Sequence, residues 1–82
     1  MINLNAYTSA AQNSWDYTLL TLNEDYILEV VCGSAAIYSV YIQLTQEEIQ
    51  NYVTQGEKAL GNLAARIRNN TNEQNKRKIE VK

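Results

Sequence analysis

The sequence predicts a single small α+β domain, in which an antiparallel sheet of three or four strands packs on one long C-terminal amphipathic helix. Residues 15–44 contain three runs of β-favouring residues, separated by turn residues. Capping signals follow at Thr45, and apolar residues then recur at helical intervals as far as Ile67. The 82 residues have room for one domain, expected over residues 1–70, and residues 71–82 are expected to form a flexible, polar, basic tail.

The three strands are expected at residues 15–22, 26–32 and 36–44, with residues 23–25 and Gly33 in the turns between them. Two other segments are candidates for a further edge strand. Ile2, Leu4 and Ala6 alternate with polar residues near the start of the chain. Ile79 and Val81 alternate near its end, where a frayed tail is the alternative.

Side-chain alternation limits the length of the turn at Gly33. A two-residue loop would pair Glu29 with Tyr38 and mix polar and apolar side chains on both faces of the hairpin. A three-residue loop, or another odd length, pairs Val30 with Tyr38 and makes the even-numbered face the core face. The opposite face then carries Ile27, Glu29, Val31, Ile37 and Tyr41. Because this face is partly apolar, it predicts that another element or a partner covers it.

The helix start is predicted by four residues around Thr45. Thr45 and Glu48 have the spacing of a capping box, and Leu44 and Ile49 have the spacing of a hydrophobic staple. The apolar stripe that follows consists of Ile49, Tyr52, Val53, Gly56, Leu60, Leu63 and Ile67. This stripe is expected to pack on the sheet over five turns.

Gly56 interrupts this helix at a cost of about 1 kcal/mol relative to Ala. Close approach of the helix to a bulky sheet residue, such as Trp15 or Tyr38, explains a glycine on the buried stripe. A kink in the helix is the alternative.

Charge divides the chain into two parts. Residues 1–57 contain seven acids and no Lys or Arg, whereas residues 58–82 contain all seven basic residues and two acids. An acidic body disfavours direct binding to phosphates, although Lys76, Arg77 and Lys78 form a short basic cluster in the expected tail.

Residues that commonly carry enzyme chemistry are scarce. The chain has no histidine, and its single cysteine, Cys32, is expected to be a buried structural residue. Its three glycines form no phosphate-binding loop, and its acids form no calcium loop. We therefore expect a non-enzyme with no catalytic residues, no metal and no cofactor. The lack of a signal-peptide pattern and of a long apolar run favours a cytoplasmic protein without a membrane span.

Protein binding has better support, because one tryptophan and six tyrosines are many for this length, and these residues are common at binding hot spots. Trp15, Tyr38 and Tyr52 are expected in the core. Acids interspersed with tyrosine suit a basic partner, because opposite charges steer association. The expected partner-binding residues are Asp16, Tyr17, Glu24, Asp25, Glu29, Tyr41 and Glu47.

The run W-D-Y from Trp15, the run D-Y-I-L-E-V-V-C-G-S and the run Y-I-Q-L-T-Q-E-E before a helix containing Gly56 resemble small bacterial immunity proteins. Those proteins accompany polymorphic toxins, including toxins of contact-dependent growth inhibition. The resemblance covers residues 15–68 and implies a cytoplasmic inhibitor that binds a cognate toxin domain, often a nuclease. It carries over no binding residues.

Two other functions remain open. One is a small nucleic-acid-associated or phage-type regulatory protein that uses the basic tail. The other is a self-associating module, in which the second face of the sheet pairs with a second copy.

Overall fold

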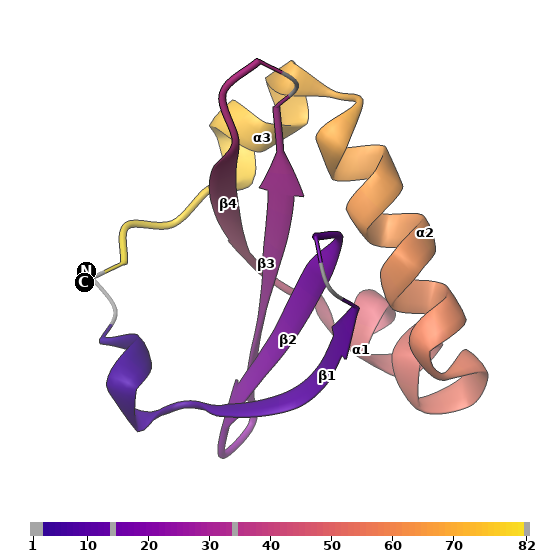
Figure 1. Ribbon diagram of the computed structural model, residues 1–82. Helices are drawn as coiled ribbons and strands as arrows, with labels where there is room; N and C mark the ends of the chain where they lie inside the picture. The colour runs from indigo at the N-terminus through magenta and orange to yellow at the C-terminus, as the bar shows by residue number, and fades with distance from the viewer. Residues whose placement is uncertain (1–2, 14, 34, 82) are drawn as a thin grey trace.

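The computed structural model describes residues 3–13, 15–33 and 35–81 and has an α+β fold (Figure 1). A four-stranded antiparallel sheet packs against three helices, which confirms the predicted class. In chain order the elements are η1 (Leu4–Ala6), β1 (Thr8–Asn13), β2 (Tyr17–Leu22), β3 (Asp25–Cys32), β4 (Tyr38–Gln43), α1 (Gln46–Gln55), α2 (Glu57–Arg68) and α3 (Thr71–Arg77).

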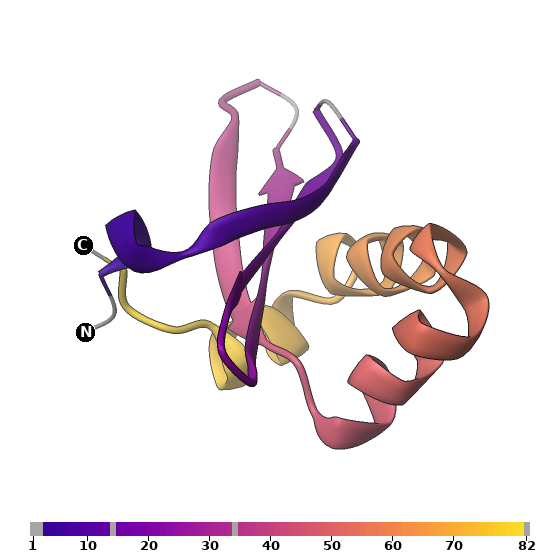
Figure 2. The same ribbon diagram turned by 90° about the horizontal axis from the view of Figure 1, so that it is seen from below.

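The sheet is a meander with the order β1-β2-β3-β4. Its first strand lies later in the sequence than the alternation of Leu4 and Ala6 suggests, because those two residues form the short 3₁₀ helix η1. The ladder between β1 and β2 shifts register between Ser9 and Ala11, and such a bulge bends the strand. Both views place η1 on the side of the sheet away from α1 and α2 (Figure 2).

The register of β3 and β4 has the predicted parity but a longer loop. Val30 pairs with Val40 and Leu28 with Ile42, so five residues, 33–37, separate the strands instead of three. Because both lengths are odd, the same set of side chains still faces the core. Gly33 has a φ of +97°, and a Cβ there would clash with the carbonyl group of Ala36, so this turn requires glycine.

The core lies between one face of the sheet and α2. On β3 and β4 the even-numbered residues face α2, as predicted, and β2 contributes Tyr17 and Leu19. The helix contributes Leu60, Leu63, Ala64 and Ile67. Cys32 is buried in this core as a free thiol, as expected.

Two aromatic residues expected in the core are exposed. Trp15 is 79% exposed, because it lies in the β1–β2 turn with a φ of +64° and not within a strand. Tyr38 is 51% exposed, because the longer loop moves it to the very start of β4. Tyr52 does pack against the core, and its ring lies edge to face with that of Tyr26, with the ring centroids 6.5 Å apart.

The start of α1 has the predicted geometry. The Thr45 side chain accepts from the backbone N–H of Glu48 at 3.2 Å, and the Glu48 carboxylate accepts from the backbone N–H of Thr45 at 2.9 Å. This reciprocal pair confirms the capping box.

The prediction of one long helix is wrong, because the chain breaks at Gly56. Gly56 has φ +73° and ψ −149°, a combination that is accessible almost only to glycine. A Cβ at this position would meet nothing within 4 Å, so close packing does not explain the glycine. The bend leaves α1 without a buried residue, and Val53, expected on the packed stripe, is 67% exposed.

Residues 71–77 are not a flexible tail, because they form α3 and dock on the end of α2 and on β4. Gln74 is buried and donates from Nε2 to the carbonyl oxygens of Ile67 (2.9 Å) and Arg68 (3.3 Å). These bonds tie α3 to the carbonyl groups at the end of α2. After α3, the Ile79 N–H donates to the Tyr41 carbonyl at 2.8 Å, so the segment briefly pairs with the edge of β4.

Candidate functional site

One face of the sheet points away from α1 and α2, and we call it the helix-free face. Alternation from the buried residues of β2, β3 and β4 assigns to it Thr18, Leu20, Leu22, Asp25, Ile27, Glu29, Val31, Ser39, Tyr41 and Gln43. Ile27 is fully buried on this face, although it is not part of the main core cluster. The short helix η1 lies on the same side of the sheet, so the name of the face refers to α1 and α2 (Figure 2). The face therefore combines a tightly packed centre with half-buried apolar and polar side chains.

Glu29 lies near the middle of the helix-free face and is held by two hydroxyl groups. Its Oε2 accepts from Ser39 Oγ at 2.7 Å and from Tyr41 Oη at 3.2 Å. Burial raises the pKa of Tyr41, and the neighbouring Glu29 carboxylate raises it further. Tyr41 therefore remains a neutral donor at physiological pH, and the Glu29 carboxylate is fixed in position without a cation.

Asp25 is the second acid of this face. The hydroxyl of Tyr7, which follows η1, lies 3.4 Å from Asp25 Oδ2. No Lys or Arg lies among residues 1–57, so the strands supply no cation to either acid. None of the ion pairs among the described residues involves Asp25 or Glu29.

Two acids of the helices, Glu48 and Glu73, are by contrast paired with arginine. Glu48 binds Arg66 at 3.1 Å and Arg77 at 2.6 Å, and Glu73 binds the same two arginines at 2.8 and 3.2 Å. Burial raises the pKa of Glu48, but hydrogen bonds from Arg77 and from the Thr45 backbone outweigh it and leave this pKa below its usual value. This four-residue cluster joins the starts and ends of three helices and has a structural role.

Asp16 also belongs to an ion pair and not to a free acidic surface. Its Oδ1 accepts from Arg68 Nη2 at 2.6 Å, and its carbonyl oxygen accepts from the same nitrogen at 3.0 Å. The expected role of Asp16 in binding a partner is therefore not supported by its surroundings.

Tyr17, also expected at the binding surface, is only 3% exposed. It faces α2 because its position on β2 pairs with Val30 of the core face. Its hydroxyl donates to Glu57 Oε1 at 3.1 Å, and burial together with this bond raises the pKa of Tyr17 to about 12. Its ring is therefore part of the core and out of reach of a partner.

Glu24 and Glu47 are exposed, but they lie beside the start of α1 and not on the helix-free face. Glu24 borders a hollow of about 250 Å³ between the β2–β3 turn and the start of α1, and Glu47 follows Gln46, which lines the same hollow. The seven expected binding residues therefore separate into a helix-free group (Asp25, Glu29 and Tyr41), a helix-side group (Glu24 and Glu47) and two structural residues (Asp16 and Tyr17).

Three apolar side chains are exposed at one end of the sheet: Trp15 and Tyr38, which were expected in the core, and Ile37, which was expected on the second face of the sheet but lies in the loop before β4. Trp15, Ile37 and Tyr38 are 79%, 62% and 51% exposed. Tyr38 pairs with Cys32, the last residue of β3. On the other edge of β3, the Val31 N–H donates to the carbonyl of Asp16, which follows Trp15 in the sequence. The three residues therefore lie at one end of the sheet, and we call them the apolar rim. The turn-favouring Asn13 and Asp16 on either side of Trp15 were the signal that this tryptophan lies in a turn.

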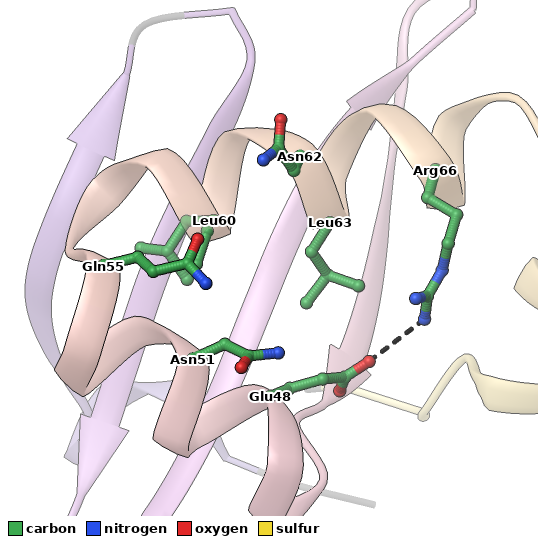
Figure 3. Close-up of a pocket in the computed structure, with 8 residues that line it drawn as sticks. Glu48, Asn51, Gln55, Leu60, Asn62, Leu63 and Arg66 are labelled. Atoms are coloured by element: carbon green, nitrogen blue, oxygen red, sulfur yellow. Dashed lines mark hydrogen bonds and ion pairs between the residues drawn. The ribbon is translucent and has the colours of Figure 1, made fainter.

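A pocket of about 240 Å³ lies between α1 and α2 (Figure 3). Leu63 and Arg66 of α2 point toward α1, where Asn51 and Glu48 line the opposite wall. The carboxylate and the guanidinium in this pocket are paired with each other, which leaves amides and leucines as its other lining groups. The pocket is smaller than typical ligand sites, and its groups are not suited to acid–base chemistry.

The basic cluster Lys76–Arg77–Lys78 is less available than its sequence suggests. Arg77 is bound to Glu48 and Glu73, and its Nη2 also donates to the Gln43 carbonyl at 3.0 Å. Lys76 and Lys78 are the exposed members of the cluster. Two exposed lysines beside paired acids form a weak phosphate-binding surface.

Among the described residues, no group of three or more His, Cys, Asp or Glu side chains is placed to hold a metal ion. Burial raises the pKa of the Cys32 thiol, which makes it a poor nucleophile. None of the helices in the described ranges is long and apolar enough to cross a membrane. No protein-family model matches the sequence, and no similar curated protein or solved structure was found.

Proposed function

We propose that this chain is a non-catalytic inhibitor that binds a basic protein surface with the helix-free face of its sheet. One observation carries the proposal: Asp25 and Glu29 lie on this face without an arginine or lysine partner, whereas Asp16, Glu48 and Glu73 are all paired with arginines. Two carboxylates on one face of the sheet, without a cation of their own, favour a cationic partner.

Two features make the face suited to binding. Ser39 and Tyr41 hold Glu29 in one position, so a partner would lose little additional side-chain entropy when it pairs with this carboxylate. Trp15 of the apolar rim, at one end of the sheet, belongs to the residue types that most often anchor interfaces. The acids would steer and orient the partner, and the rim would supply buried apolar area.

The partner that we propose is a toxin domain, which makes the chain an immunity protein. The resemblance of residues 15–68 to small immunity proteins supports this class. Nucleases are the toxins that fit best, because a surface that binds nucleic-acid phosphates carries Lys and Arg. An acidic face would compete with the nucleic acid for those same residues.

The proposal is tested by co-expression with a toxin domain encoded next to the gene for this chain. We expect the chain to restore growth and the purified proteins to form a salt-sensitive complex. Glu29→Lys should weaken the complex at least tenfold, because it places a cation against the basic partner. Glu47→Lys is the matched control, since it makes the same change of charge on the exposed helix side.

Equal losses in the two variants would show that net charge, and not the helix-free face, is responsible. Failure of the chain to bind or to protect against the neighbouring toxin would refute the immunity function.

A further inference from the structure

The apolar stripe of the C-terminal region runs through the bend at Gly56 without a change of period. On a straight helix, one narrow strip of the surface would carry Ile49, Val53, Leu60 and Ile67, because their spacings are close to whole numbers of 3.6-residue turns. In the structure the two halves of this stripe belong to separate helices, α1 and α2. The sequence thus has the pattern of one helix, whereas the folded chain contains two.

The bent arrangement leaves several favourable interactions unmade. Gly56 occupies a backbone conformation that other residues avoid, and α2 starts without a side-chain cap. The Gly56 N–H keeps a helical bond to the Tyr52 carbonyl at 2.7 Å, but the Ala59 N–H donates to the Gly56 carbonyl, one residue short of the helical pattern. Val53 remains 67% exposed.

Straightening the chain at Gly56 would restore the helical bonds and return Val53 to the stripe. A continuous helix over residues 46–68 would be about 34 Å long and would carry α2 off its own sheet. Leu60, Leu63, Ala64 and Ile67 would then lose their core contacts. Only a second copy of this chain, straightened in the same way, offers the matching vacant sheet face.

We propose that two copies of this chain exchange α2 and α3 through straightening at Gly56, which forms a domain-swapped dimer. A short hinge favours such exchange, and the hinge here is one residue long. Each core contact of the monomer re-forms between the copies, and the Asp16–Arg68 ion pair becomes intermolecular. The dimer gains the continuous helix, and the monomer is favoured at low concentration by the entropy of the free chains.

The test is Gly56→Ala, measured by size-exclusion chromatography with light scattering. Alanine is strained at φ +73° and favours a helix by about 1 kcal/mol over glycine, so the variant should be mainly dimeric at concentrations where the wild type is monomeric. The dimer should persist on dilution, because exchange requires α2 to leave the core. Gly61→Ala is the matched control, since it adds the same methyl group in open space within α2 and should stay monomeric.

A chemically synthesised chain with D-alanine at position 56 tests the opposite direction. The angles +73° and −149° are the mirror image of a polyproline-like conformation, which suits a D-residue. This chain should be monomeric and more stable than the wild type. A folded, monomeric Gly56→Ala variant, or a dimer that dissociates on dilution, would overturn the proposal.

If Gly56→Ala fails to fold, the wild-type chain provides the test. Refolding the wild type from denaturant at millimolar concentration should give a dimer fraction that the D-alanine chain lacks. Absence of that fraction would equally overturn the proposal.

Discussion

Arg68, at the C-terminal end of α2, clamps the β1–β2 turn by donating to both the carboxylate and the carbonyl oxygen of Asp16, at 2.6 and 3.0 Å. Its Nε also donates to the Val31 carbonyl at 2.8 Å. One guanidinium therefore joins the last turn of a helix to the β1–β2 turn and to β3. Asp16 and Arg68 are 52 residues apart in the sequence, and only the packing of α2 on the sheet brings them together.

Arg68→Met should lower the free energy of unfolding by about 2 kcal/mol, because it removes the hydrogen bonds of the guanidinium to the Asp16 carboxylate and to the carbonyl oxygens of Asp16 and Val31. Both side chains are about one-third exposed, so solvent screening keeps the effect below that of a fully buried pair. Urea denaturation measures the change. Lys58→Met, an exposed position on the same helix, should change stability by less than about 0.5 kcal/mol.

Acid should unfold the protein partly through Glu48. The pKa values of Glu48 and Glu73 lie below the usual value of 4.5, so the stability that these carboxylates contribute is present above that value and is lost as pH falls through the lowered native pKa. Glu48→Gln should therefore reduce the loss of stability between pH 7 and pH 3. At pH 7 the variant should be less stable by about 2 kcal/mol.

Gln at position 48 still serves a capping box, so Glu48→Gln isolates the contribution of the charge. Glu47→Gln, at the exposed neighbouring residue, is the control for a change of net charge. Identical pH profiles for the two variants would contradict the role given to the Glu48 ion pairs.

Removal of residues 71–82 should destabilise the domain by on the order of 3 kcal/mol. The truncation takes away the Gln74 bonds to the end of α2 and the Arg77 partner of Glu48. Removal of a flexible tail would leave the melting temperature unchanged, whereas removal of the docked helix α3 should lower it. Thermal unfolding therefore distinguishes a flexible tail from a docked helix. Lys76→Ala, an exposed change within α3, should leave the melting temperature nearly unchanged.

Trp15→Asn should raise stability and, if the proposed toxin partner binds this end of the sheet, weaken that binding at the same time. Trp15 has a φ of +64°, where asparagine is tolerated better than a bulky residue, and relief of this strain should add about 1 kcal/mol. At 79% exposure the indole loses little burial when it is replaced.

Val53→Ala is the binding control, since Val53 is exposed to a similar degree but lies on α1. Growth protection and urea denaturation report the two effects separately. A Trp15→Asn variant that binds as tightly as the wild type would exclude Trp15 from the interface.

Local patterns determined several features of this protein. Thr45 and Glu48 set the helix start through contacts between residues three positions apart, and side-chain parity determined which faces of β3 and β4 point to the core. The lack of Lys and Arg before residue 58 made Glu29 a candidate binding residue, and this choice stays a prediction. Each of these features depends on residues that are close along one element.

Tertiary structure decided the remainder. The break at Gly56 was hidden because the apolar period continues through it, and only packing against the sheet favours the bent chain. The docking of α3 and the burial of Tyr17 depend on contacts with α2. Asp16 was mistaken for a free acid because its partner lies 52 residues away. The pattern of hydrophobicity and charge in a sequence indicates whether a residue needs burial or a charged partner. The fold determines which residue, distant in the sequence, supplies the burial or the partner.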